Sequence, residues 1–301
     1  MPDYKPKPVL NIMAELGECP IWCVEDQALY WIDIDRMTIN RFDPKDGKNK
    51  EWKLPAMPGC FALCDGNGAV IAARDGIYDF NFANGTAKML CKAPFDTSVM
   101  RFNDGRTDRQ GRLWAGTLAV DFAQMGKIPG AFYRYDGVTL ESGISPIAIA
   151  NGTAFSPDGK TMYRAESGEL RVYAYDYNPD LGVASRQRVF AEIPQGFGAP
   201  DGAAIDSEGG YWVALPAGAK TGGVARFKPD GKMDFYFEMP VLVPTMIAFG
   251  GPNMSTLYIT TARLEALMPK PIPDSAGNLF AVETPFRGIP EAKFRSRKKH
   301  F

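Results

Sequence analysis

A polar turn followed directly by an aromatic or β-branched run recurs along this chain. The turns contain aspartate, asparagine or glycine, as in residues 108–111 and 156–159. The apolar runs end at six positions, which are Trp31, Ile71, Trp114, Tyr163, Trp212 and Tyr258. Successive copies lie 40 to 49 residues apart. A repeat of this length, with turn chemistry and no helical pattern, predicts the blades of a β-propeller.

Further strand signatures fill the intervals between these copies. Five segments alternate or are rich in aromatic residues, namely residues 39–42, 76–80, 131–135, 170–175 and 223–227. Residues 277–282 have the composition of one more strand, which could complete a blade begun at the other terminus. We therefore predict an all-β chain that forms a six-bladed β-propeller with four-stranded antiparallel blades. The hairpins are predicted from the chemistry of the turns, whereas the number of blades is predicted by counting the repeats.

Composition limits the remaining possibilities. The chain has 301 residues and 45% hydrophobic residues, and the repeat runs through it without a linker. This predicts a single propeller domain over residues 1–301, with a flexible basic tail from about residue 293. The net charge of −1 provides no field for nucleic acid or for an acidic membrane surface. No apolar stretch approaches the roughly 18 residues of a spanning helix, and residues 1–8 do not resemble a signal peptide, so we expect a cytoplasmic protein.

The scarcity of histidine excludes much of catalytic chemistry. His300 is the only histidine and lies beside the C-terminus, so a Ser-His-Asp or Cys-His mechanism is not expected. The five cysteines are an odd number confined to the first third of the chain, which argues against a disulfide framework. Two Cys-x3-Cys spacings suggest zinc, but without nearby histidine we expect those cysteines to pack as small hydrophobic residues. The remaining candidates for a functional site are carboxylate, amide and arginine side chains, with or without a bound metal ion.

Four oxygen-bearing side chains stand just upstream of equivalent strands: Glu18, Asn103, Asn151 and Asp201. Asn103, Asn151 and Asp201 are 48 and 50 residues apart, which is about one repeat, and Glu18 lies 85 residues before Asn103. Asn151-Gly152 and Asp201-Gly202 are also ordinary turn dipeptides. Their shared position in the repeat favours convergence at the axis, where a ring of oxygen ligands suits a hard divalent cation.

These motifs resemble the SMP-30/gluconolactonase/LRE family, also called regucalcin-like proteins, over nearly the full length. The resemblance is carried by five motifs, Gly17-Glu18-x-Pro20-x-Trp22, Arg101-Phe102-Asn103-Asp104-Gly105, Asn151-Gly152, Ser156-Pro157-Asp158-Gly159 and Pro200-Asp201-Gly202. It implies a six-bladed propeller with one divalent metal ion at the central mouth, and an activity on sugar lactones. The chain departs from the family pattern at Cys19, where glycine is frequent, and at Glu166-Ser167, where Asp-Ser is usual.

The resemblance also implies roles for particular residues. Glu18, Asn151 and Asp201 would be metal ligands, and Asn103 a further ligand or a substrate contact. Arg101 would bind substrate, and Asp121 falls where relatives carry an acidic residue over the pocket. We expect Asp104 to form a turn rather than to act in catalysis.

The predicted function is a divalent-metal-dependent sugar lactonase that opens an aldonolactone to its acid. Asp201 is the candidate general base, and Arg101 and Asn103 would orient the sugar. The metal could be Ca²⁺, Zn²⁺, Mg²⁺, Mn²⁺ or Fe²⁺. Loops at residues 119–130, 195–199 and 215–221 would set specificity. We expect Arg164 and Lys220 to face solvent rather than an anionic substituent.

Two other functions remain open. One is a non-enzymatic Ca²⁺-binding regulatory propeller, since oxygen ligands alone suit that ion. The other is a phosphotriesterase-like hydrolase on the same scaffold. A sugar lactone is the only partner that the motifs suggest, and nothing in the sequence indicates the oligomeric state.

Overall fold

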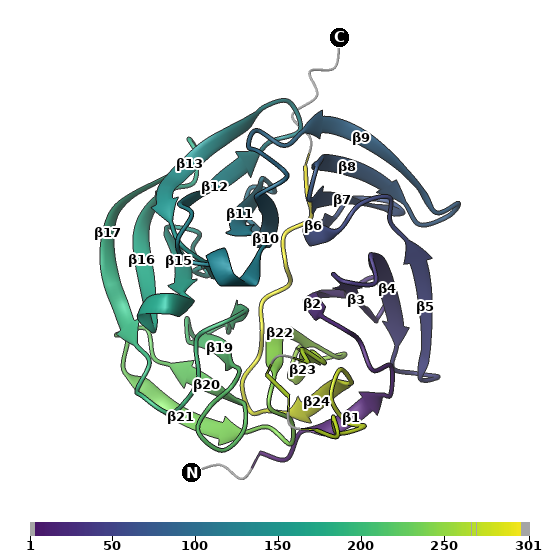
Figure 1. The fold of residues 1–301 in the computed structure, drawn as a ribbon, viewed down its shortest axis with the longest axis vertical. Helices are drawn as coiled ribbons and strands as arrows, with labels where there is room; N and C mark the ends of the chain where they lie inside the picture. Colours follow the sequence, from purple (N-terminus) through teal and green to yellow (C-terminus); the bar gives the residue numbers. More distant parts are fainter. Residues whose placement is uncertain (1–3, 266, 269, 296–301) are drawn as a thin grey trace.

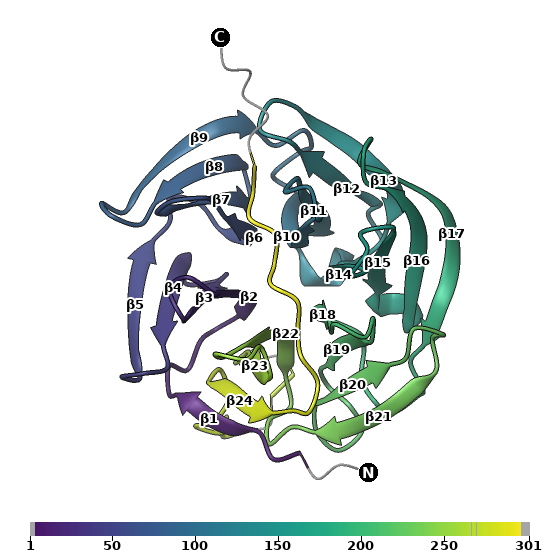
Figure 2. The ribbon, with the colours of Figure 1, turned by 180° about the vertical axis from the view of Figure 1, so that it is seen from behind.

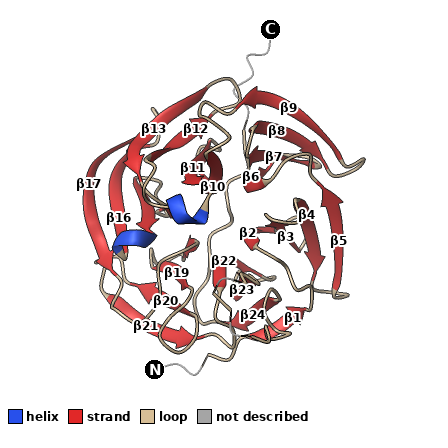
Figure 3. Ribbon diagram, in the orientation of Figure 1, coloured by secondary structure: helices blue, strands red, loops and turns tan. Residues whose placement is uncertain are grey.

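Six four-stranded antiparallel sheets form a ring in the computed structural model, which describes residues 4–265, 267–268 and 270–295 (Figure 1). The described part of the chain contains two helical segments, the short 3-10 turns η1 (Phe122–Gln124) and η2 (Ser167–Glu169) (Figure 3). None of its helices has the length and apolar character needed to span a bilayer. The predicted all-β, six-bladed propeller is confirmed.

In five blades the strands follow chain order from the axis outward (Figure 1). The first three blades comprise β2 (Gly17–Cys23), β3 (Ala28–Asp33), β4 (Thr38–Asp43) and β5 (Lys48–Lys53); β6 (Pro58–Leu63), β7 (Gly68–Ala73), β8 (Gly76–Asn81) and β9 (Thr86–Lys92); and β10 (Met100–Thr107), β11 (Leu113–Ala119), β12 (Gly130–Tyr135) and β13 (Leu140–Ile147). The fourth and fifth comprise β14 (Ala150–Phe155), β15 (Thr161–Glu166), β16 (Arg171–Asn178) and β17 (Val183–Glu192); and β18 (Ala203–Ile205), β19 (Tyr211–Leu215), β20 (Gly223–Phe227) and β21 (Met233–Glu238).

The sixth blade is built from both ends of the chain. It comprises β22 (Pro244–Gly250), β23 (Thr256–Thr261), β24 (Leu279–Glu283) and the N-terminal β1 (Lys7–Leu10). β1 pairs antiparallel with β24, with Lys7 opposite Ala281. This pairing closes the ring and confirms that the last strand completes a blade begun at the other terminus.

The recurring aspartate turn is held by its own side chain. Buried Asp206 accepts hydrogen bonds at Oδ1 from the backbone N–H groups of Glu208 (2.9 Å) and Gly210 (2.8 Å). Its Oδ2 accepts from Trp212 Nε1 and Arg226 Nε, each at 2.7 Å. One carboxylate thus shapes the turn and ties it to the next two strands, which explains why the turn and the aromatic run recur as a unit.

The core lies between the blades. The inner strands β6, β14 and β22 are buried at every residue, whereas the outermost β5 and β9 are largely exposed. Trp212 of the fifth blade packs edge-on against Phe249 of the sixth, with ring centroids 5.3 Å apart. Burial of these faces is the main source of stability, because the blades contact one another through apolar side chains.

After β24 the chain crosses the ring at the end that carries the aspartate turns (Figure 2). Ser207 in the turn of the fifth blade donates its backbone N–H to Arg287 O (2.8 Å). Phe294 donates its backbone N–H to Leu63 O of the second blade (2.7 Å). Residues 284–295 therefore form a strap that links distant blades across this end of the ring.

The remaining sequence predictions about the chain ends concern this strap. The flexible tail predicted from about residue 293 falls mostly on residues 296–301, which lie outside the described residues. The assignment of residues 1–301 to one domain stays a prediction.

The strap provides a test of stability. The ring of Phe294 is buried (6% exposed) and stacks on Tyr135, with centroids 5.6 Å apart. We expect Phe294→Ala to lower the free energy of unfolding by about 3 kcal/mol, because it removes a buried aromatic side chain and leaves a cavity. Urea unfolding followed by tryptophan fluorescence measures this change. Leu181→Ala, at a side chain that is 66% exposed, is the control, with an expected loss below about 0.5 kcal/mol. Equal losses in the two variants would show that the strap does not stabilise the ring.

Candidate functional site

The predicted site residues lie where the inner strands begin, at the end of the ring opposite the strap. Glu18 is the second residue of β2, and Asn151 is the second residue of β14. Arg101 and Asn103 lie in the first half of β10, and Asp201 precedes β18 by two residues. Four blades therefore direct these side chains toward one mouth at the axis, as the repeat predicts.

A break in strand register places three of these side chains. The pairing shifts between Glu18 and Ile21 in the first blade, and between Asn151 and Ala154 in the fourth. A similar shift between Phe102 and Gly105 brackets Asn103 in the third blade. A β-bulge interrupts the alternation of a strand and redirects a side chain, so these shifts turn polar groups toward the axis.

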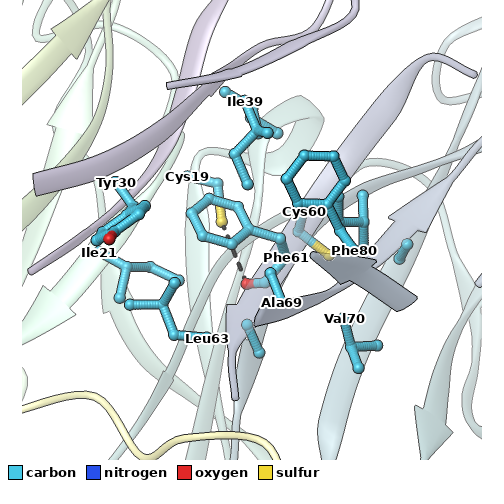
Figure 4. Close-up of a cluster of buried hydrophobic side chains, with 14 of the residues drawn as sticks. Cys19, Ile21, Tyr30, Ile39, Cys60, Phe61, Leu63, Ala69, Val70 and Phe80 are labelled. Carbon is cyan, nitrogen blue, oxygen red and sulfur yellow. Dashed lines mark hydrogen bonds between the residues drawn. The ribbon is translucent and has the colours of Figure 1, made fainter. Parts of the chain in front are cut away.

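The residues after Glu18 and Asn151 take the left-handed backbone conformation that the bulge requires. Gly152 has φ 58°, and a Cβ there would lie 2.3 Å from the Tyr211 hydroxyl, so glycine is needed at this position. Cys19 has φ 47°, which lies in the left-handed region that favours glycine. The Cys19 thiol lies in the core between blades, 3.7 Å from Phe61 O (Figure 4). Burial raises the pKa of this thiol to about 12, so it is not a reactive group at neutral pH.

A chain of hydrogen bonds orients the amides at the mouth. Arg101 Nη1 donates to Asn103 Oδ1 (2.9 Å), and Asn103 Nδ2 donates to Asn151 Oδ1 (2.8 Å). Asn151 Nδ2 then donates to Ser167 Oγ (2.9 Å), whose hydroxyl donates to Pro200 O (2.7 Å). The chain links the third, fourth and fifth blades and ends one residue before Asp201. The amide oxygen of Asn103 accepts a hydrogen bond from the charged guanidinium of Arg101. Asn151 Oδ1 accepts a hydrogen bond only from the neutral amide of Asn103 and keeps a second lone pair free.

Glu18 and Asp201 form a pair of carboxylates without a cationic partner. Neither has a Lys or Arg nitrogen within 4.0 Å among the described residues, although Glu18 Oε2 accepts the Cys19 backbone N–H at 3.2 Å. Burial raises the pKa of Glu18 well above its usual range, and the charges of Asp201 and Asp104 raise it further. Burial likewise raises the pKa of Asp201, again assisted by Asp104, while Arg101 lowers it. The mouth therefore concentrates negative charge that a bound cation would neutralise.

The chemistry of these donors fits a hard divalent cation. Two carboxylates and the free lone pair of Asn151 would supply oxygen ligands from three blades. No group of three or more His, Cys, Asp or Glu side chains that could hold a metal ion occurs within the described residues. The fit therefore depends on the amide oxygen of Asn151, and an all-carboxylate or thiolate site is not formed.

Asp104 lies deeper on the axis than the other acidic residues. It belongs to β10 rather than to a turn, so the expected role as a turn former is wrong. Its Oδ2 accepts the Thr153 backbone N–H (2.7 Å), while its buried Oδ1 has no hydrogen-bond partner among the residues described. Below it, Arg106 pairs with Glu291 of the strap and donates to Thr153 O (3.0 Å). The register shift between Phe102 and Gly105 interrupts the alternation, so the consecutive residues Asn103 and Asp104 both contact the fourth blade.

Other predicted residues take different places. Asp121 is exposed and accepts the Ala123 backbone N–H at Oδ1 (2.9 Å), so it caps η1, which lies near the centre of the ring in Figure 1. Arg164 is buried, not solvent-facing, and pairs with Glu166 at 3.0 Å. Lys220 lines a hollow of about 600 Å³ where the loops at residues 195–199 and 215–221 meet β21, toward the rim of the fifth blade.

Sequence reasoning missed Arg74 at the mouth. Arg74 follows β7 directly and donates from Nε to Thr97 O (2.9 Å), in the segment that leads into β10. Burial lowers the pKa of Arg101, and the charge of Arg74 contributes to this, while Asp35 and Glu18 raise it. In each blade the second strand ends at the mouth. The only signal for Arg74 in the sequence is that it directly follows the second strand of the second blade.

Comparisons with known proteins agree with this geometry. The family profile described as "SMP-30/Gluconolactonase/LRE-like region" matches residues 16–263. A 6-deoxy-6-sulfogluconolactonase from Pseudomonas putida is 37% identical over 96% of this chain and 98% of that protein. An L-arabinolactonase from Azospirillum brasilense is 32% identical (93% and 92% covered), and regucalcin from Xenopus laevis is 31% identical (87% and 88% covered).

Solved structures show the same architecture. A calcium-binding protein, regucalcin, from Agrobacterium tumefaciens superposes with a TM-score of 0.89 at 26% identity, covering 97% of this chain and 98% of that chain. A luciferin-regenerating enzyme superposes with a TM-score of 0.86 at 27% identity, covering 97% and 99%.

The unpaired carboxylates lead to a prediction about the metal-free protein. Glu18→Gln replaces a carboxyl group, whose ionised form burial and Asp201 disfavour, with a neutral amide, so in EDTA at pH 7.5 we expect the melting temperature to rise by about 2–4 °C. Added Ca²⁺ or Mn²⁺ should raise the melting temperature of the wild type more than that of Glu18→Gln, because the variant loses a ligand. Differential scanning calorimetry measures both shifts. Glu51→Gln on the outermost strand β5 is the control, with no expected shift. The electrostatic interpretation would be contradicted if Glu18→Gln melted at a lower temperature than the wild type in EDTA and if the added cation raised the melting temperatures of both proteins equally.

Proposed function

The chain belongs to the SMP-30/gluconolactonase/LRE family, and from this premise we propose that it is a sugar lactonase that hydrolyses an aldonolactone to the aldonic acid with the help of a divalent cation. The observation that carries the proposal is the convergence of two unpaired carboxylates, an amide oxygen and Arg101 at one mouth. The names of the relatives support the substrate class, since they include lactonases for a gluconolactone derivative and for arabinolactone.

In this proposal Glu18, Asn151 and Asp201 hold the cation. Asn103 is assigned to substrate rather than to the cation, because its amide oxygen already accepts from Arg101 and its Nδ2 donates to Asn151. Oxygen ligands of this kind accommodate Ca²⁺, Mg²⁺, Mn²⁺, Zn²⁺ or Fe²⁺. Asn103 therefore keeps Asn151 oriented and contributes to the wall of the substrate site.

The chemistry that such a cation supplies is Lewis acidity, which polarises a lactone carbonyl and lowers the pKa of water. Asp201 takes a proton from the attacking water as its oxygen bonds to the carbonyl carbon. The bond between that carbon and the ring oxygen breaks, and the ring oxygen leaves as a hydroxyl group by taking the proton that Asp201 accepted, which restores the carboxylate of Asp201. Arg101 Nη1 is held by Phe102 O and Asn103 Oδ1, so Nη2 and Nε remain to bind substrate oxygens.

A second candidate is a Ca²⁺-binding regulatory propeller without turnover. The resemblance to proteins named regucalcin, one of them described as calcium-binding, supports it. Arg101 favours the lactonase, because a site that only stores a cation does not require a buried guanidinium beside its ligands.

Hydrolysis of a lactone panel tests the proposal. We expect proton release from gluconolactone, xylonolactone, galactonolactone or arabinonolactone, followed with a pH indicator, to stop on chelation and to recover with one of the divalent metals. Asp201→Asn should lower kcat by at least roughly 100-fold, because it removes the proposed base and a ligand charge. Asp230→Asn, in a turn at the far end of the blade, is the control. Turnover that survives chelation and Asp201→Asn would refute this mechanism, whereas cation binding with no turnover on any lactone would favour the regulatory propeller.

Substitution of Asn151 and of Asn103 should affect different properties, namely cation affinity and substrate binding. Asn151→Ala removes a proposed ligand, so we expect Mn²⁺ affinity, measured by isothermal titration calorimetry, to fall at least roughly tenfold. Asn103→Ala should alter Mn²⁺ affinity less and raise the KM for the lactone. The reverse pattern, with Asn103→Ala losing the ion and Asn151→Ala keeping it, would exchange the two assignments.

A further inference from the structure

Arg74 and Arg101 place two guanidinium groups at the same side of the mouth. Arg74 ends the second strand of the second blade, and Arg101 begins the first strand of the third. Thr97, whose carbonyl accepts from Arg74 Nε at 2.9 Å, lies four residues before Arg101. A Cβ at Gly59 of β6 would lie 2.4 Å from the backbone of Phe102, so the two blades meet closely at this point.

Neither guanidinium has an ion-pair partner among the residues that the structure describes. Ten arginines of the described chain lie within 4.0 Å of a carboxylate oxygen: Arg36, Arg41, Arg106, Arg112, Arg134, Arg164, Arg171, Arg186, Arg188 and Arg226. Arg74 and Arg101 are not among them. Arg101 is 7% exposed and Arg74 is half-buried, so both have lost part of their hydration without gaining a counter-ion.

The hydrogen bonds of both side chains leave donors free. Arg74 uses Nε for Thr97 O, and its two terminal nitrogens donate to no group within the residues that the structure describes. Arg101 uses Nη1 for backbone and for Asn103, which leaves Nη2 and Nε. Asp35, the acidic residue whose charge acts most strongly on Arg101, is exposed and lies beyond ion-pair distance. The charge of Arg74 acts unfavourably on Arg101, and an anion between the two groups would relieve this repulsion.

From this arrangement we infer that Arg74 and Arg101 bind an anionic group carried by the substrate, so that the preferred lactone bears a sulfonate, phosphate or carboxylate at the end distant from its carbonyl. This inference rests on the proposed lactonase function. An arginine fork matches the oxygens of such a group with two parallel hydrogen bonds, and two forks from adjacent blades would grip it from two sides. The cationic side would then fix the anionic end, while the carbonyl faces Glu18 and Asp201.

Two other basic residues near this end, Arg164 and Lys220, are not suited to this purpose. Arg164 is occupied by Glu166 and by Tyr175, to whose hydroxyl it donates at 2.9 Å. Lys220 lies at the hollow beside β21, toward the rim. Arg74 is thus the residue that would distinguish an anionic from a neutral lactone.

Steady-state kinetics on paired substrates tests the inference. The probes are 6-deoxy-6-sulfogluconolactone, 6-phosphogluconolactone, a glucarolactone with a free carboxylate, and neutral gluconolactone. We expect the wild type to prefer one of the anionic lactones, and the group it prefers identifies the substituent. In Arg74→Gln, kcat/KM for that lactone should fall roughly 10- to 100-fold, mainly through KM, while the value for gluconolactone changes less than about threefold. Arg74→Lys should recover part of the loss, and Arg188→Gln on an outer strand is the control for net charge.

Binding of product acids separates this inference from the proposed function. Isothermal titration calorimetry should show 6-phosphogluconate binding the wild type more tightly than gluconate, with the difference lost in Arg74→Gln. If no lactone is hydrolysed but this difference persists, the lactonase proposal fails and the anion site stands. Equal effects of Arg74→Gln on anionic and neutral lactones, or a wild type that does not favour any anionic lactone or acid, would overturn the inference.

Discussion

Pairing of β1 with β24 is the interaction on which the site depends, because it closes the ring. Thr245 at the start of β22 donates its hydroxyl to Gly17 O, and Gly202 donates its backbone N–H to Thr245 O (2.8 Å). The sixth blade therefore holds the start of β2 next to the start of β18. The charges of Glu18 and Asp201 act on one another because the first and fifth blades are both fastened to the sixth. Glu18 and Asp201 are 183 residues apart in the sequence. Loss of ring closure would therefore separate the two carboxyl groups.

The two ends of the ring divide stability from function. At the strap end, several buried charges are satisfied, as in the four hydrogen bonds accepted by Asp206 and in the pairing of Arg106 with Glu291. At the mouth, two carboxylates and two guanidinium groups are at least partly buried and have no ion-pair partner among the described residues. Such an arrangement costs free energy, and the satisfied end and the apolar blade interfaces offset that cost. Cys19 belongs to the same pattern, since a non-glycine residue with φ 47° adds strain directly beside Glu18.

Much of the fold was predictable because turn chemistry is local. An aspartate that bonds its own turn identifies a hairpin from a few residues, and the spacing of such turns identifies blades. The convergence of Glu18, Asn151 and Asp201 followed from their common place in the repeat. What a count of residues could not supply was the bulge, which turned Asp104 from an expected turn former into an axial residue. Arg74 was missed for a related reason, since its importance comes from a contact with Thr97 that joins two blades.

Apart from Asp104, which lies deeper on the axis, and the exposed Asp35, the charges at the mouth divide by side. Glu18 and Asp201 come from the first and fifth blades, while Arg74 and Arg101 come from the second and third. Neither pair neutralises the other at ion-pair distance within the described residues, although Arg101 acts on both carboxyl groups electrostatically. A cation on one side and an anionic group on the other would each relieve repulsion within its own pair. A ligand that carries a polarisable carbonyl at one end and a negative group at the other would bind such a mouth in a single orientation, which is the requirement for attack at one carbon atom.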